Sequence, residues 1–240
     1  MSVSRRSFFS GLSASLGGMV GAAEAATPEL RAPAGGPRWG MVVDTARCIG
    51  CQACTVSCIM ENAVPEDSFR TIVSTYEVRE GDRAAMVMLP RLCNHCEEPP
   101  CIPVCPVGAT YQRADGIVVV NADACVGCAY CVQACPYDAR FINHETQKAD
   151  KCTFCAHRVD AGLLPGCVES CVGGARIFGD LNDPGSTVSR LLAQNESKVL
   201  KPEMETGPRV FYLGLDDAFL GKVEAEPTLW HPSHGQEAQS

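Results

Sequence analysis

The chain lacks the features that mark several common functional classes. Beyond its N-terminal stretch it has no run of about 18 apolar residues, so we expect no membrane span. Its 28 Asp and Glu residues outnumber its 20 Lys and Arg residues, which argues against nucleic acid as a partner. No G-x-G-x-x-G run follows a predicted strand, and there is no P-loop and no supported Ser–His or Cys–His pairing. The sequence therefore shows no motif for transforming a substrate.

What the chain does have is cysteine: 16 in 240 residues, in four groups of four with none left over. The first and third groups are spaced C-x2-C-x2-C-x3-C, the second C-x2-C-x4-C-x3-C and the fourth C-x2-C-x11-C-x3-C. The groups are Cys48, Cys51, Cys54 and Cys58; Cys93, Cys96, Cys101 and Cys105; Cys125, Cys128, Cys131 and Cys135; and Cys152, Cys155, Cys167 and Cys171. Runs of this kind hold 4Fe–4S clusters in bacterial ferredoxins. The pattern predicts four such clusters, enough for a chain of electron carriers.

Disulfides and structural zinc are the alternatives. Sixteen cysteines in 240 residues fall below the roughly 8–10% that is typical of disulfide scaffolds. Zinc sites use two C-x2-C pairs, but C-x2-C-x2-C-x3-C crowds three ligands onto one loop, which suits a cube better than a tetrahedron. Pro106 and Pro136 also follow the last cysteine of two groups, as in the C-P ending of the ferredoxin run. The pattern favours iron–sulfur clusters over a zinc-stapled interaction protein.

Residues 1–25 are predicted to be a twin-arginine signal peptide. Arg5 and Arg6 precede a weakly apolar stretch, and Ala23-Glu24-Ala25 resembles a cleavage site. Twin-arginine export carries proteins that are already folded, which suits clusters inserted in a reducing compartment. We therefore expect the protein on the periplasmic side of the cytoplasmic membrane, attached to it through a membrane subunit.

An internal repeat organises the centre of the chain. Residues 44–51 match residues 121–128 and place Gly50 and Gly127 at the same step, while residues 105–109 align with residues 171–175. We expect an α+β fold of two nested ferredoxin-like units, with short strands and helices around the clusters. The predicted divisions are the signal peptide, a flexible leader at 26–38, a four-cluster domain at 39–180 and a C-terminal docking extension at 181–240.

Short elements are expected between the cysteine groups. Strands are predicted at 39–43, 109–112, 117–120, 140–143 and 209–215, and helices at 55–62, 132–134 and 188–194. Arg47, Arg91 and Lys151 lie close to cysteines and could raise cluster potentials, but we expect them to be solvated surface charges. We expect no ligand role for His95, although it could hydrogen-bond a sulfur atom. In two-cluster ferredoxins the fourth cysteine of a run binds the other cluster, and spacing alone leaves open which groups are partners.

Longer stretches carry a resemblance to a known family. They are residues 47–58, 89–96, 125–144 and 211–219, with the sequences RCIGCQACTVSC, LPRLCNHC, CVGCAYCVQACPYDARFINH and FYLGLDDAF. They resemble the four-cluster iron–sulfur subunits of molybdopterin oxidoreductases of the dimethyl-sulfoxide-reductase type. Within that family they are most similar to the beta subunits of tetrathionate reductases.

The resemblance implies nested ligation at four sites. Site 1 takes Cys48, Cys51, Cys54 and Cys171; site 2 takes Cys58, Cys152, Cys155 and Cys167; site 3 takes Cys93, Cys96, Cys101 and Cys135; site 4 takes Cys105, Cys125, Cys128 and Cys131. It also implies a molybdopterin catalytic subunit and a quinol-oxidising membrane subunit as partners. This chain is then a non-catalytic electron-transfer subunit for the reduction of tetrathionate to thiosulfate. The alternative is the same role in a polysulfide, thiosulfate, sulfoxide or nitrite reductase complex.

Overall fold

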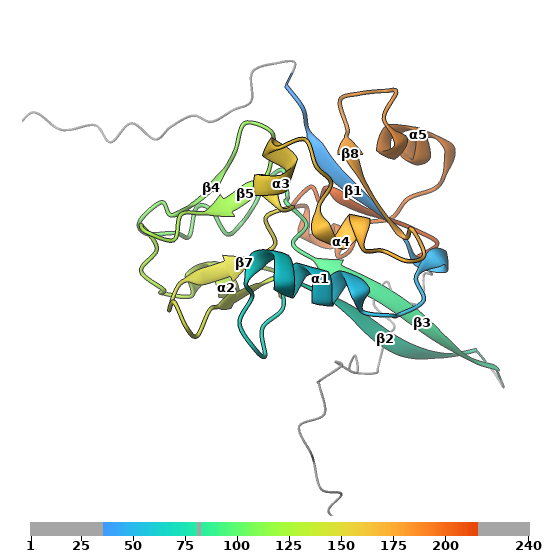
Figure 1. Ribbon diagram of the computed structural model, residues 1–240, viewed down its shortest axis with the longest axis horizontal. Coiled ribbons are helices and arrows are strands. Elements are labelled where there is room, and N and C mark those ends of the chain that lie inside the picture. Colours follow the sequence, from blue (N-terminus) through green and yellow to red (C-terminus); the bar gives the residue numbers. More distant parts are fainter. Residues whose placement is uncertain (1–35, 81–82, 216–240) are drawn as a thin grey trace, which may run out of the picture.

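The computed structural model describes residues 36–80 and 83–215, and a three-stranded sheet joins the two ends of this range. Its strands are β8 (Arg176–Asp180), β1 (Trp39–Asp44) and β9 (Val210–Leu213), in that order. β1 runs antiparallel to β8 and parallel to β9 (Figure 1). Helix α5 (Thr187–Gln194) packs on one face of this sheet. The strands expected at 39–43 and 209–215 and the helix expected at 188–194 are confirmed.

Two short ribbons form the opposite side of the molecule (left in Figure 1). They consist of β4 (Thr110–Gln112) with β5 (Val118–Val120) and β6 (Arg140–Ile142) with β7 (Ala149–Lys151). Their turns are closed by side-chain acceptors, because Asp115 accepts from the Ile117 N–H and Asn143 accepts from the Glu145 N–H. Both hairpins were expected, and both are confirmed.

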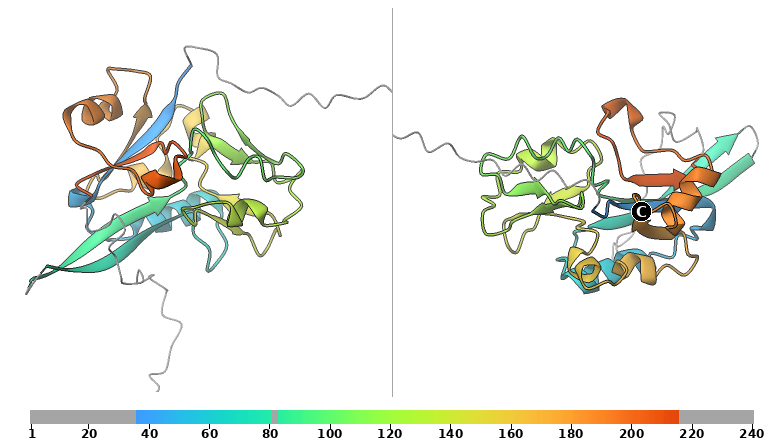
Figure 2. Two further views of the ribbon diagram at one scale, coloured as in Figure 1. Left: turned by 180° about the vertical axis from the view of Figure 1, so that it is seen from behind. Right: turned by 90° about the horizontal axis from the view of Figure 1, so that it is seen from above.

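The longest strand pair was not expected. β2 (Thr71–Glu80) and β3 (Arg83–Leu92) are antiparallel over ten residue pairs and project from the body of the molecule (Figures 1 and 2). At the base of this hairpin Val73, Leu89 and Leu92 are buried in the main apolar core. The base of the hairpin is therefore anchored in the core.

Four of the helices in the described part of the chain begin inside the cysteine groups. α1 (Ala53–Asn62) and α2 (Tyr130–Gln133) start at equivalent steps of the repeat, each after a left-handed residue, Gln52 or Ala129. Gly127 has a positive φ of 72°, and a Cβ on it would lie 2.3 Å from the Gln147 carbonyl oxygen, so this step requires glycine. The turn η1 (Thr45–Arg47) precedes the first group, and α3 (Ala156–Asp160) and α4 (Gly166–Glu169) lie within the fourth.

Residues 181–215, the described part of the expected extension, are packed into the fold. Besides α5 and β9 they include the turn η2 (Pro202–Met204). The Tyr212 side chain is fully buried, and its hydroxyl donates to the Pro90 carbonyl of β3 at 2.9 Å. The predicted signal peptide, most of the leader and residues 216–240 lie outside the described residues, and the domain boundaries stay predictions. Among the residues described, no helix is long and apolar enough to cross a membrane.

Candidate metal centres

The cysteines of site 1 line one cavity of about 340 Å³. Cys48, Cys51 and Cys54 lie in and just after the loop between η1 and α1, and Cys171 follows α4. The sheet brings these distant segments together, because the Asp44 N–H donates to the Ala175 carbonyl at 2.8 Å where β1 meets β8. The Ala175 N–H in turn donates to Cys171 Sγ at 3.2 Å.

The cysteines of site 2 line a second cavity, of about 280 Å³, and all four are buried. Cys58 reaches it from α1, which packs against α4. Burial raises the pKa of the Cys58 thiol to about 12, and the nearby Cys167 and Cys155 thiols act in the same direction. A bound metal deprotonates a coordinating thiol outright, so this donor set is suited to holding positive charge.

Site 3 is a third cavity of this kind, and site 4 lies in a separate small core. Cys93, Cys96, Cys101 and Cys135 line a cavity of about 310 Å³, in which burial raises the pKa of Cys96 to about 11. In site 4, Cys125 and Cys131 are buried with Cys105 packed against them, while Cys128 on the same loop is exposed. The cysteines of site 4 therefore gather at the ribbon end of the molecule.

Backbone N–H groups surround Cys105. The Ala109 N–H donates to its Sγ at 3.2 Å, the same contact that Ala175 makes with Cys171 in the aligned stretch. Burial acts to raise the pKa of Cys105, but these backbone donors outweigh it and lower that pKa. The predicted repeat is thus visible as a shared N–H···S geometry.

The cavities of sites 1 to 3 share one kind of lining, because four cysteines line each of them. Such a set suits a cluster of metal and sulfide atoms, whose corners each take one thiolate.

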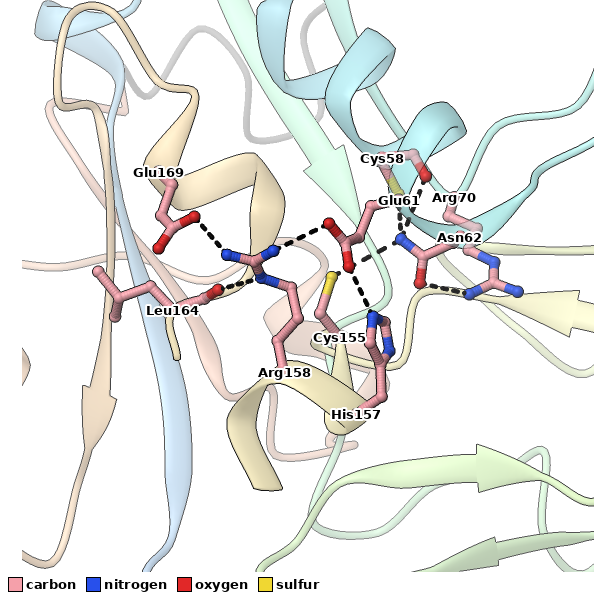
Figure 3. Close-up of polar contacts among 9 residues, drawn as sticks. All are labelled: Cys58, Glu61, Asn62, Arg70, Cys155, His157, Arg158, Leu164 and Glu169. Carbon is pink, nitrogen blue, oxygen red and sulfur yellow. Dashed lines mark hydrogen bonds and ion pairs between the residues drawn. The ribbon is translucent and has the colours of Figure 1, made fainter. Parts of the chain in front are cut away.

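Sequence reasoning missed one side chain at site 2. Asn62, in the last turn of α1, points its amide nitrogen at Cys58 Sγ and Cys155 Sγ, each at 3.6 Å (Figure 3). Arg70 donates to the Asn62 amide oxygen at 3.0 Å and pairs with Asp150 of β7 at 2.8 Å. Because these contacts fix the orientation of the amide, Asn62 is held as a donor to two thiols.

A second polar cluster ties α1 to the fourth cysteine group (Figure 3). Glu61 pairs with Arg158 at 2.9 Å and with His157 at 2.8 Å, and Arg158 also pairs with Glu169 of α4. The hydrogen bond from His157 lowers the pKa of Glu61, and Arg158 adds to this effect. The cluster holds α1, α3 and α4 around site 2.

Two other expectations are resolved by burial. His95 is fully buried, its Nδ1 accepts from the Val118 N–H at 3.0 Å, and its ring stacks on Phe154 with centroids 3.8 Å apart. These contacts show that the His95 ring packs in the core. Lys151, expected to be a solvated surface charge, is instead only 1% exposed, so that expectation was wrong.

Comparison with known proteins identifies the family. Residues 47–109 and 84–181 each match the family described as a 4Fe–4S dicluster domain. Over 199 residues the chain is 65% identical to the B subunit of the tetrathionate reductase of Salmonella typhimurium, and 80% of each chain is covered. It is 42% identical to the putative iron–sulfur protein of a dimethyl sulfoxide reductase of Halobacterium salinarum, over 73% of this chain and 78% of the relative. The chain belongs to the iron–sulfur subunits of the dimethyl-sulfoxide-reductase type.

A further member of this group of relatives matches nearly the whole chain. Protein NrfC of Escherichia coli is 42% identical over 88% of this chain and 95% of its own. With two dicluster matches and sixteen cysteines, the iron–sulfur subunit described here holds four 4Fe–4S clusters. The fold class, the cofactor and the family predicted from the sequence are therefore confirmed.

Proposed function

We propose that this protein carries electrons through four 4Fe–4S clusters, bound at sites 1 to 4, between two partner subunits of a tetrathionate reductase. A membrane subunit that oxidises quinol supplies the electrons. A molybdopterin catalytic subunit uses two of them to break the central S–S bond of tetrathionate and release two thiosulfate ions. The 65% identity to a subunit of a known tetrathionate reductase supports this acceptor.

One pattern of burial carries the proposal: each end site has one exposed cysteine, and the middle sites have none. Cys51 of site 1 and Cys128 of site 4 are exposed, whereas all four cysteines of site 2 are buried. Sites 1 and 2 share α1, Cys152 of site 2 and Cys93 of site 3 lie in one core, and sites 3 and 4 meet in the second core. These neighbours support the order 1–2–3–4, with η1 (blue, right) and α2 at opposite ends of the molecule in Figure 1.

Apolar side chains surround both exposed cysteines. Ile49 and Val172 are 64% and 75% exposed near site 1, and Val126 and Tyr130 are 62% and 57% exposed near site 4. Ile49 and Val126 occupy the same step of the repeat. Exposed apolar groups that gather around a functional site are typical of protein interfaces. We assign one end to the catalytic subunit and the other to the membrane subunit.

The residues of the chain perform three tasks along this path. When bound, the clusters supply one-electron carriers. The cysteines hold them at fixed positions, and the buried cysteines of sites 2 and 3 keep water from the middle of the path. N–H donors such as those of Ala109 and Ala175 favour the more negatively charged state of a sulfur ligand and thus tune its potential.

We also propose a periplasmic location. The Arg5-Arg6 pattern and the small residues at 23–25 support export by the twin-arginine route. The protein is then held at the membrane by its membrane subunit.

A cysteine variant in the assembled complex tests the proposed function. Cys54→Ser removes a buried ligand of site 1. We expect quinol-driven tetrathionate reduction to fall to background, while reduction driven by a dye at the catalytic subunit persists. Met60→Ala, an exposed neighbour on α1, is the matched control and should leave both activities unchanged. Full quinol-driven activity in Cys54→Ser contradicts an electron path through site 1.

The acceptor is tested in the same assay. The wild-type complex should reduce tetrathionate much faster than dimethyl sulfoxide or polysulfide. The reverse preference would leave the electron path in place and replace the acceptor, as the 42% identity to a putative sulfoxide reductase protein allows.

A further inference from the structure

Of the four buried cationic side chains in the described part of the chain, Arg209 has Asp115 as an acidic neighbour, whereas the other three lie among the cysteines without one. Arg176, Lys151 and Arg140 are 3%, 1% and 5% exposed. No carboxylate in the described part of the chain forms an ion pair with any of them. Burying a charge is costly unless another charge compensates it. Something other than an acidic side chain therefore balances these three.

Arg176 lies between sites 1 and 2. It lines the cavity of site 1, and its Nη2 donates at 2.7 Å to the Thr71 hydroxyl, which lines the cavity of site 2. Its Nη1 is buried and has no hydrogen-bond partner within residues 36–80 and 83–215. Burial acts to lower the pKa of Arg176, but Cys167 of site 2 and Cys54 of site 1 outweigh it and raise that pKa. The guanidinium thus faces the thiols of both sites.

Arg140 occupies the corresponding position between sites 3 and 4. It lines the cavity of site 3 and donates to the Thr110 hydroxyl at 3.2 Å, and its Nη2 has no partner in the described residues. Cys101 of site 3 and Cys131 of site 4 both act to raise its pKa. Each arginine follows the last cysteine of its group by five positions, Cys135 or Cys171, and opens a strand, β6 or β8. The two arginines therefore share one local placement, at the start of a strand that follows a cysteine group.

Lys151 lies between sites 2 and 3. Its ammonium donates to the carbonyl of Cys152, a cysteine of site 2, at 2.7 Å. It also donates to the carbonyl of Val118, a residue that lines the cavity of site 3. The three cations therefore occupy the three junctions of the 1–2–3–4 order.

We propose that Arg176, Lys151 and Arg140 are the counter-charges of the electron path, one at each junction between successive sites. The proposal rests on the ligand sets of the proposed function. A 4Fe–4S cluster with four thiolates carries net negative charge, and each arriving electron adds to it. In a poorly polarisable interior, a cation between two such groups favours electron addition at either one and weakens their mutual repulsion. Each cation thus raises the reduction potentials of two neighbouring clusters.

The test is an EPR-monitored redox titration of the full-length protein in its complex. Arg176→Gln, Lys151→Gln and Arg140→Gln each remove one charge. We expect the equilibrium constant for one-electron reduction to fall on the order of tenfold at two of the four centres, which corresponds to about 59 mV. The affected pairs should overlap, so that the middle centres shift in two variants and the end centres in one. Arg47→Gln, which removes an exposed cation lining the same cavity as Arg176, is the control and should shift its centre far less.

The outcomes separate this proposal from the proposed function. A wild-type complex with fewer than four reducible centres contradicts the ligand sets themselves. With four centres present, shifts no larger than that of Arg47→Gln, or equal shifts at all four centres, overturn the counter-charge role. Where a Gln variant loses iron, the charge-preserving variant at the same position decides whether that position needs a positive charge. These variants are Arg176→Lys, Arg140→Lys and Lys151→Arg. If the charge-preserving variant binds its full complement of iron and has nearly wild-type potentials, the junction needs a positive charge. If that variant also loses iron, the counter-charge role is rejected for that junction.

Discussion

The two halves of the molecule contain the same number of proposed cluster sites, but very different amounts of protein structure frame those sites. Sites 1 and 2, the first unit, are framed by the ten-residue helix α1, the three-stranded sheet and α4. Sites 3 and 4, the second unit, are framed chiefly by ribbons of three-residue strands. Of the six buried residues in the small core of the second unit, three are cysteines: Cys101, Cys125 and Cys131. The first unit can keep an apolar core of its own, whereas the second takes much of its cohesion from iron and sulfide.

Iron removal should expose this contrast most strongly. After anaerobic chelation we expect the amides of β4 to β7 to exchange almost as in an unfolded chain, with opening free energies near zero. Strands β1, β8 and β9 should keep measurable protection, because Met41, Val43 and Tyr212 remain buried in an apolar core. Hydrogen exchange followed by mass spectrometry measures both regions in one sample. Equal loss of protection in the two units contradicts the comparison.

A change at Asn62 should alter the reduction potential of site 2 in the first unit and leave the potentials of the second unit unchanged. Asn62→Leu removes the donor to Cys58 and Cys155 and should make site 2 harder to reduce. Hydrogen bonds to charged groups contribute about 1.5–3 kcal/mol. Because these contacts are long, we expect about a tenfold change in the reduction constant, or about 59 mV. A redox titration should show one shifted centre and three unchanged ones.

The control for this variant is Asn195→Leu, an exposed asparagine at the end of α5. It should leave all four potentials unchanged. An Asn62→Leu protein with four wild-type potentials would show that the amide has only a structural role.

The smallest effect is expected at the surface link between the units. Arg113, beside the β4–β5 turn, pairs with Asp160 of α3 at 2.5 Å and lowers the pKa of that carboxyl. Asp160 is 52% exposed, so water and salt screen the pair. Arg113→Gln should cost about 0.2–1 kcal/mol in thermal or denaturant unfolding at low salt, and nothing measurable at about 1 M salt. Arg190→Gln, on exposed α5, should show no such salt dependence.

Features that depend on residues close together in the sequence could be predicted. The ribbon turns, the end of α1 at Asn62 and the shared geometry of Gly50 and Gly127 follow from nearby residues, and all are present. The β2–β3 hairpin was missed although its sequence carries a usable signal, because Gly81-Asp82 stands between two β-prone runs.

Features that arise from contacts across the chain could not be predicted. Asn62 reaches Cys155 across 93 positions, and asparagine has no signature as a partner of sulfur. Lys151 was expected at the surface because a lysine beside a cysteine is usually solvated. On the counter-charge proposal, the negative charge of the neighbouring sites accounts for its burial. No single stretch of sequence shows that those sites lie beside it. The same reasoning applies to Arg140 and Arg176. Their shared offset from a cysteine can be read in the sequence, but its significance appears only once their burial is known.

The central position of β1 has a consequence for synthesis on the ribosome. β1 is the first described strand to emerge, yet both of its neighbours, β8 and β9, are made more than 130 residues later. The ribbons, by contrast, pair within about ten residues and can form while translation continues. Until β8 and β9 arrive, β1 presents two unpaired edges, the kind of surface that invites aggregation. This sheet can therefore be completed only after almost the whole described chain has been made.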